Sequence, residues 1–131
     1  MYMLDTDLCI YIINEKTAAL QKKLNRHVGH VCISSITLAE LFFGVENSKR
    51  REANLAEVLD FVNNLSVLPF DAAAAMEYGP ARAALQQTGQ LIGPNDMFIA
   101  AHALGIKATL VTNNVKEFSR VQGLWIENWL Q

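Results

Sequence analysis

Few of the features that mark common protein classes occur in this sequence of 131 residues. There are only two cysteines, Cys9 and Cys32, and they lie in apolar runs without CxxC spacing or nearby histidine ligands. A zinc site is therefore not expected, and both are predicted to be buried, reduced thiols. We also find no signal-peptide pattern and no apolar run long enough to span a membrane, which predicts a cytoplasmic location.

The sequence also lacks a strong excess of charge of either sign. Its formal net charge is −2, which argues against a generally basic nucleic-acid-binding surface but allows a local basic rim. Two clusters are candidates for such a rim: Lys22, Lys23 and Arg26 with His27 and His30, and then Lys49, Arg50 and Arg51. Ordinary solvated surface is the alternative interpretation of both clusters.

Nucleophilic and phosphate-binding motifs are missing as well. No GxSxG elbow, glycine-rich phosphate loop or Ser-His-Asp ordering occurs. Because 51% of the residues are hydrophobic, residues 1–131 are expected to form a single globular domain with a full core. The chemistry must then rest on acidic side chains and on what they bind.

Short apolar runs alternate with longer stretches of helical periodicity. Strands are predicted at 2–4, 31–33, 66–68, 108–111 and 124–126. Helices are predicted after Asp7, at 16–26, from Ser35 or Thr37 to about Val45, and at 52–65, 71–87 and 96–104, where Gly105 ends the last one. This alternation predicts an α/β fold with a mostly parallel sheet covered by helices on both faces.

Three acids stand alone in apolar surroundings. Asp5 ends the first strand, Glu40 is the only charged residue between positions 31 and 45, and Asp96 is the only one from 83 to 106. Isolated carboxylates are costly to bury unless something pairs with them. All three can meet at the carboxyl end of the sheet, where open α/β sheets bind ligands. Acids that meet there can hold a divalent cation, which indicates metal-dependent phosphodiester chemistry.

Structural explanations exist for some of these acids. An acid after a strand often caps the next helix, which applies to Asp5 and better to Asp7, the predicted N-cap. Asp96 also suits the first turn of a helix, where the helix dipole favours negative charge. Glu40 lacks such an explanation, because it lies on an apolar helix face with no Lys or Arg within a turn or two before it.

Two further polar features lie near these acids. Thr112, Asn113 and Asn114 follow the fourth strand and suit a turn, but their oxygens can also orient a water or support metal ligands. His102 lies six residues after Asp96, on the opposite helix face. It is predicted to be a partly buried, structural histidine.

Four segments in register closely resemble PIN-domain ribonucleases. They are Met3-Leu4-Asp5-Thr6-Asp7, Ser35-Ile36-Thr37-Leu38-Ala39-Glu40-Leu41, Gly93-Pro94-Asn95-Asp96, and Val111-Thr112-Asn113-Asn114 through Glu117-Phe118. The likeness covers nearly the whole chain. More narrowly, the chain resembles VapC-type toxins of bacterial toxin–antitoxin systems. It implies a PIN-like α/β/α sandwich with about five strands and Mg²⁺- or Mn²⁺-dependent cleavage of RNA, with a tRNA stem-loop as one substrate class. A VapB-like antitoxin partner and a homodimer are also implied.

The resemblance also implies roles for individual residues. By position, Asp5, Glu40 and Asp96 match the family's catalytic, metal-binding acids, and Asn114 stands where many members have a fourth acid. With Asn114 neutral, we expect one tightly held ion and a second that arrives with the substrate. Asp7 stands where the family usually has Asn, and its role is left open, as is that of Glu117.

Two other functions are left open by the sequence. Asp5-Thr6-Asp7 after a strand also resembles the start of haloacid-dehalogenase-like phosphatases, in which Asp5 would be the nucleophile. The chain is short for the cap of such an enzyme and lacks a convincing downstream Lys followed by paired acids. A catalytically inactive PIN-fold binding module is the other alternative. Metal-dependent RNA cleavage by the pure protein distinguishes these functions.

Overall fold

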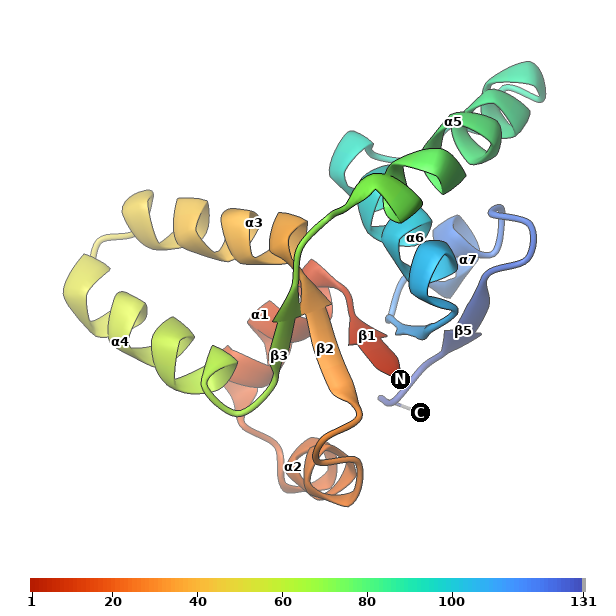
Figure 1. Cartoon of the computed structure of the whole chain (residues 1–131). Coiled ribbons are helices and arrows are strands. Elements are labelled where there is room, and N and C mark those ends of the chain that lie inside the picture. Colours follow the sequence, from red (N-terminus) through yellow and green to blue (C-terminus); the bar gives the residue numbers. More distant parts are fainter. Residues whose placement is uncertain (131) are drawn as a thin grey trace.

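Five parallel strands form the centre of the molecule (Figure 1). The computed structural model describes residues 1–130. Its strands are β1 (Tyr2–Leu4), β2 (Val31–Ser34), β3 (Ser66–Leu68), β4 (Thr109–Val111) and β5 (Trp125–Glu127). They lie in the order β3-β2-β1-β4-β5, and every pairing is parallel. The predicted sheet is confirmed, with strand ends that differ from prediction by one residue at most.

Seven helices connect the strands in the described part of the chain. They are α1 (Thr6–Glu15), α2 (Ala18–Arg26), α3 (Ser35–Glu46), α4 (Arg51–Val62), α5 (Ala72–Gln87), α6 (Pro94–Ile106) and α7 (Val115–Phe118). The short α7 was not predicted, because four residues are too few to show helical periodicity.

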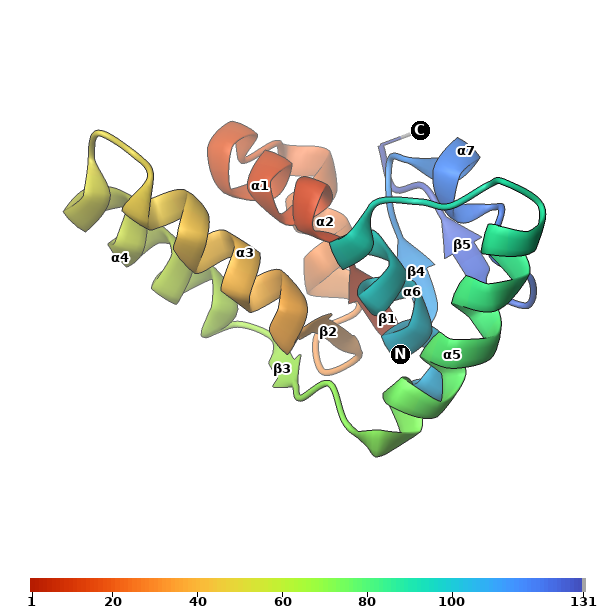
Figure 2. The same cartoon turned by 90° about the horizontal axis from the view of Figure 1, so that it is seen from above.

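Each face of the sheet has its own hydrophobic core, because successive strand residues point to opposite faces. Met3 and Leu110 pack with residues of α5 and α6, whereas the next residues, Leu4 and Val111, pack with residues of α1, α3 and α4. Seen from above, α1 and α5 lie on opposite sides of the sheet (Figure 2). This arrangement is the predicted α/β/α sandwich.

The N-cap of α1 is Asp5, so the prediction that Asp7 caps this helix is wrong. Asp5 Oδ1 accepts a hydrogen bond from the Leu8 backbone N–H at 2.9 Å, and Asp7 is exposed in the first turn. Asp5 alone lies between the end of β1 and the start of α1. There is thus no loop in which a later residue could serve as the cap.

The cap of α3 was also placed too late by the sequence. Ser34, the last residue of β2, accepts a hydrogen bond from Ile36 N at 3.1 Å, so neither Ser35 nor Thr37 is the N-cap. The Ser34 hydroxyl also lies 2.8 Å from His102 Nδ1. His102 is therefore structural, as predicted, but it is fully buried, and burial lowers its pKa.

The second helix is shorter than predicted. Lys16 has a left-handed backbone (φ 50°) and ends α1, so α2 begins only at Ala18. Leu20 is buried and Leu24 half-buried, as predicted, but Ala18 and Ala19 are exposed. The methyl groups of these two alanines are therefore not part of the core.

Gly105 does not end α6, as the sequence predicted, but lies inside it. The helix runs to Ile106, and Lys107 takes the left-handed conformation that ends it (φ 56°). A Cβ atom at position 105 would lie 3.1 Å from the backbone N and Cα of Ala74 in α5. Glycine is needed here because α5 and α6 pack closely at this point.

Two expectations from composition can also be compared with the structure. Cys9 and Cys32 are both buried and free, as predicted. Within residues 1–130, no helix combines the length and apolar character that a membrane crossing requires.

Gly105→Val is expected to destabilise the protein by about 2 kcal/mol or more, because the added side chain presses against the α5 backbone. Urea denaturation measures the effect. Gly44→Ala in α3 is a suitable control, since nothing lies within 4 Å of its added Cβ and alanine favours a helix by up to about 1 kcal/mol. Equal effects of the two substitutions would contradict the close packing of α5 on α6.

Candidate functional site

The three isolated acids lie at one edge of the sheet, where the strands end. Asp5 follows β1, Glu40 lies in the second turn of α3, and Asp96 lies in the first turn of α6. The first turns of α1 and α6 are side by side near the centre of the view in Figure 2. Parallel strands direct all of these helix starts toward the same edge, as the sequence predicted.

Asp5 is the most buried of the three acids, with 2% of its surface exposed. Oδ1 accepts from Leu8 N, and Oδ2 accepts from the Thr112 hydroxyl at 2.5 Å. Burial raises the pKa of Asp5 to about 6, with smaller contributions from the charges of Asp7 and Glu40, although the two hydrogen bonds oppose this rise. Asp5 therefore joins β1, α1 and β4 at one point.

Glu40 receives a hydrogen bond on each of its carboxylate oxygens. The Thr6 hydroxyl donates to Oε1 at 2.5 Å, and the Asn95 side-chain amide donates to Oε2 at 3.2 Å. Thr6 also lies 3.1 Å from the Thr37 hydroxyl of α3. Neutral donors from α1 and α6 thus hold a half-buried acid that has an apolar helix face behind it.

Asp96 lies beside Glu117, a residue to which the sequence assigned no role. The pKa of Asp96 is raised to about 7, and burial is the largest cause. Its hydrogen bond with Glu117 and the charges of Glu117, Asp5 and Asp7 also raise it. Two carboxyl groups can make such a bond only when one of them carries a proton. The raised pKa of Asp96 and the lowered pKa of Glu117 favour Asp96 as the partner that holds the proton.

Glu117 is held by two further donors. Oε1 accepts from Gly93 N at 3.1 Å, and Oε2 accepts from the Asn114 side-chain amide at 2.7 Å. Burial favours the neutral form of Glu117, but its hydrogen bonds and the charge of Arg120 outweigh burial and lower its pKa. Asn114 also donates its backbone N–H to the Thr112 hydroxyl at 2.9 Å.

These contacts and two peptide links close a ring at the end of the sheet. We call it the acidic ring, and its members in order are Asp5, Thr6, Glu40, Asn95, Asp96, Glu117, Asn114 and Thr112. Neither of the two ion pairs in residues 1–130 involves a ring carboxylate. The ring acids therefore have neutral hydrogen-bond donors around them in place of paired cations.

The donor set of the ring fits a hard divalent cation. Carboxylate, amide and hydroxyl oxygens are the ligands that Mg²⁺ and Mn²⁺ prefer, and Mg²⁺ needs few protein ligands because it keeps several waters. In residues 1–130, no three acidic, cysteine or histidine side chains already form a ligand cluster. The acids are close enough to raise one another's pKa, which is the situation that a cation relieves.

Comparison with known proteins identifies this arrangement. Residues 2–124 match the PIN domain. A tRNA(fMet)-specific endonuclease VapC from Shigella flexneri is 46% identical over 128 residues, which cover 98% of this chain and 97% of that protein. DNA-bound VapBC from Salmonella typhimurium superposes with a TM-score of 0.96 at 44% identity, with 98% of this chain and 97% of that chain covered. VapBC2 from Rickettsia felis, bound to a DNA fragment from its promoter, gives 0.95 at 43% identity and 98% coverage of both chains.

The chain belongs to the PIN-domain family.

Within this family it belongs to the VapC ribonucleases, so the resemblance drawn from the four motifs is confirmed. The same assignment rejects the phosphatase alternative.

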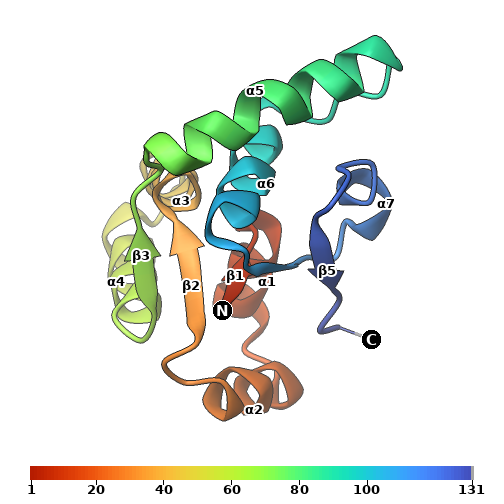
Figure 3. The ribbon, with the colours of Figure 1, turned by 45° about the vertical axis from the view of Figure 1, so that its right-hand side comes forward.

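The first basic cluster lies at the wrong edge of this PIN domain to form a rim around the acids. Residues 22–30 belong to α2 and the loop before β2, at the edge where the strands begin (Figure 3). His27 packs against aromatic rings there, with ring centroids 4.6 Å from Tyr2 and 5.4 Å from Trp129. Its imidazole contributes to packing, away from the acidic ring.

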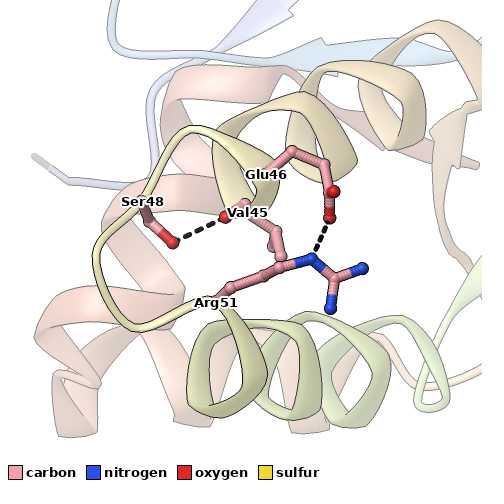
Figure 4. A network of polar contacts seen from close by, with 4 residues as sticks. All are labelled: Val45, Glu46, Ser48 and Arg51. Atoms are coloured by element: carbon pink, nitrogen blue, oxygen red, sulfur yellow. Dashed lines mark hydrogen bonds and ion pairs between the residues drawn. The ribbon is translucent and has the colours of Figure 1, made fainter.

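The second basic cluster follows the C-terminal end of α3, and the N-terminal end of this helix is the one joined to β2. Figure 4 shows that Arg51 Nε donates to Glu46 Oε2 at 2.5 Å, while the Ser48 hydroxyl donates to the Val45 carbonyl at 2.6 Å. Residues 49–51 are otherwise exposed. Lys49 and Arg50 lie in the turn between α3 and α4, and Arg51 begins α4. The ordinary surface interpretation suits all three better than a rim.

The sequence missed three members of the ring. Thr6 and Asn95 each stand next to a predicted acid, Asp5 and Asp96, and this adjacency was the available signal. Glu117 lies three residues after Asn114, a spacing that brings side chains together on a helix. The contacts of Thr6 and Asn95 with Glu40, and of Glu117 with Asp96, could not be derived from periodicity, because they join elements that are far apart in the chain.

In metal-free buffer, Asp5→Asn is expected to raise the free energy of unfolding at pH 8 by about 1–3 kcal/mol. The pKa of Asp5 is raised from 3.8 to about 6, so its contribution to stability is fully present below pH 4 and is lost as the pH rises through 6. Asn keeps the helix cap and removes this cost.

Urea denaturation at pH 8 and pH 4 measures this change. The gain should fall by more than half at pH 4, where Asp5 is largely neutral in the folded state and partly neutral in the unfolded chain. A gain that is independent of pH would contradict a buried carboxylate whose ionisation opposes folding.

Proposed function

We propose that this chain is a divalent-metal-dependent endoribonuclease that acts as the toxin of a toxin–antitoxin pair. The acidic ring supports this function most strongly, because it gathers four carboxylates at the ligand-binding edge of a parallel sheet without paired cations. Mg²⁺ or Mn²⁺ is the proposed cofactor. The chain's VapC relatives, which are named as ribonucleases, support the same activity.

Asp5 and Asp96 are the proposed principal ligands of the cation, and Glu40 is the third. A bound Mg²⁺ or Mn²⁺ supplies positive charge at the phosphate and lowers the pKa of a bound water. Asp5 keeps its orientation because Leu8 N and Thr112 fix both of its oxygens. Asp96 must lose its proton for the ligand role, so Mg²⁺ or Mn²⁺ binding should weaken as the pH falls below about 7.

The proposed substrate class is tRNA, and initiator tRNA is the first candidate to test. Relatives from Shigella flexneri and Salmonella typhimurium, at 46% and 44% identity, are named as tRNA(fMet)-specific endonucleases. Mapping of cleavage sites on total RNA, with Mg²⁺ and with chelator, identifies the target directly. Cleavage of many unrelated RNAs would reject a tRNA substrate while leaving the nuclease activity in place.

Asp5→Asn should reduce RNA cleavage by at least about 10²-fold, because it removes the charge of a principal ligand while keeping the helix cap. The measurement is the cleavage rate of total tRNA with and without Mg²⁺. Asp60→Asn, an exposed acid on α4, is the matched control and should keep full activity. Full activity of Asp5→Asn would reject the metal site. No metal-dependent cleavage by the wild-type protein would favour the inactive binding module.

The fourth carboxylate of the site is proposed to be Glu117, with Asn114 as its support. This departs from the sequence-based interpretation, in which Asn114 itself occupies the fourth position and orients a water. The amide nitrogen of Asn114 is directed at Glu117 Oε2 at 2.7 Å. Its amide oxygen is still free to accept a hydrogen bond from a water.

Glu117→Gln should weaken Mn²⁺ binding by about 10- to 100-fold, and Asn114→Ala should have a smaller effect. Asn114→Asp should tighten Mn²⁺ binding, because added ligand charge favours the cation. Calorimetric titration with Mn²⁺ measures all three variants. Unchanged affinity in Glu117→Gln, together with weakened affinity in Asp96→Asn, would limit the site to three acids.

A VapB-like antitoxin is the proposed partner. VapBC from Salmonella typhimurium and VapBC2 from Rickettsia felis share this fold over 98% of the chain, and both were solved as VapBC bound to DNA. An antitoxin segment that presents an Arg side chain to the ring would supply the cation that its carboxylates lack. Binding of such a segment should compete with Mn²⁺.

A homodimer is also proposed, through the elements around edge strand β3. Large apolar side chains are exposed there on α3, α4, β3 and α5, including Phe43 (70% exposed) and Met76 (78%). Leu59 of α4 adds to this surface. Apolar patches of this kind commonly mark interfaces.

Phe43→Glu should raise the dissociation constant of the dimer at least about tenfold, because a charge at this position opposes apolar contact between the subunits. Light scattering across a concentration series measures the mass. Val28→Glu is the control, because Val28 is equally exposed (67%) but lies after α2, at the edge of the sheet where the strands begin. A wild-type protein that stays monomeric at high micromolar concentration would reject the dimer.

A further inference from the structure

Asn95 is an exposed residue that links two of the ring carboxylates. Its side-chain amide donates to Glu40 Oε2 at 3.2 Å across the gap between α6 and α3. Its backbone is joined directly to Asp96. Asn95 therefore connects the position of Glu40 to that of Asp96.

The helix that carries Asn95 does not need its side chain. Pro94 occupies the first position of α6, and Met97 N donates to the Gly93 carbonyl at 2.9 Å. The backbone N–H of Gly93 donates to Glu117 Oε1 at 3.1 Å. The Asn95 amide is thus directed away from its own helix, and its contact is Glu40.

Glu40 has few other constraints on its orientation. Thr6 holds one oxygen at 2.5 Å, and Asn95 is the partner of the other oxygen among the described residues. Neither ion pair of residues 1–130 includes Glu40. Without the Asn95 amide, the carboxylate can turn about its contact with Thr6, and its second oxygen no longer has a fixed direction.

We propose that Asn95 is a positioning residue for the reaction, which acts by fixing the direction of the second oxygen of Glu40. This inference rests on the proposed nuclease function. The amide touches neither the cation nor the RNA in this role. Asn95 acts on the geometry of the acids, so its loss should change turnover more than substrate binding.

The test compares three substitutions of Asn95 with one control. Asn95→Ala removes the amide, Asn95→Asp keeps its shape but replaces the donor with a carboxylate, and Asn95→Gln keeps an amide donor. An acid also suits the first turn of α6, which protects the fold of Asn95→Asp. Asn63→Ala, at an exposed asparagine after α4, is the control. The readouts are kcat and KM on a tRNA substrate, Mn²⁺ affinity by calorimetry, and the thermal midpoint.

Removal of an outer partner of a metal-binding group typically costs about 10- to 100-fold. We expect that loss in kcat for Asn95→Ala and Asn95→Asp, with KM changed less than about threefold. The thermal midpoint should be nearly unchanged in Asn95→Ala. Asn95→Gln should recover most of the loss, and Mn²⁺ affinity should fall in Asn95→Ala. Asn63→Ala should match the wild type in every readout.

Several results would overturn the inference. Wild-type kcat and Mn²⁺ affinity in Asn95→Ala, with Glu40→Gln inactive, would reject the role of Asn95 and leave the nuclease function intact. A loss of kcat that follows a lowered thermal midpoint and is not recovered by Asn95→Gln would show a structural role only. Full activity in both Glu40→Gln and Asp5→Asn would instead reject the proposed function itself.

Discussion

The buried carboxylate of Asp5 is the constraint on which the rest of the site depends. It caps α1 through Leu8 N and accepts the hydroxyl of Thr112, 107 residues further along the chain. These two bonds fix the end of β1 against the start of α1 and the end of β4. Burial of an unpaired acid opposes folding, and the raised pKa of Asp5 records that cost. This unfavourable burial lies at the edge of the sheet where a bound cation would compensate for it.

Glu40 and Glu117 follow the same principle. Each is held by neutral donors that set its direction without neutralising its charge: Thr6 and Asn95 for Glu40, and Gly93 and Asn114 for Glu117. A lysine or arginine in these places would occupy the site that a divalent ion needs. Protons and cations therefore compete for the same oxygens, and acid pH should favour the metal-free state.

Much of the fold was predictable, because the central strands β1, β2 and β4 are short, mostly buried apolar runs that alternate along the chain with helical stretches. The isolated acids were predictable too, since an unpaired charge in an apolar run is conspicuous. The N-caps Asp5 and Ser34 were placed late because the helices start where the strands end, without a loop between them. Asn95 and Glu117 gain their roles from contacts between distant elements, which no local pattern reveals. The basic clusters were misplaced for the same reason.

The central claim is that the acidic ring holds a divalent cation. Crystals of the wild-type protein grown with Mn²⁺, with anomalous diffraction collected near the manganese absorption edge, test it most directly. The account predicts an anomalous peak within ligand distance of Asp5 and Asp96, near 2.0–2.3 Å as expected of oxygen ligands to hard cations, and its loss in crystals of Asp5→Asn. Ordered carboxylates without a peak at millimolar Mn²⁺, or a peak at another place on the molecule, would contradict it.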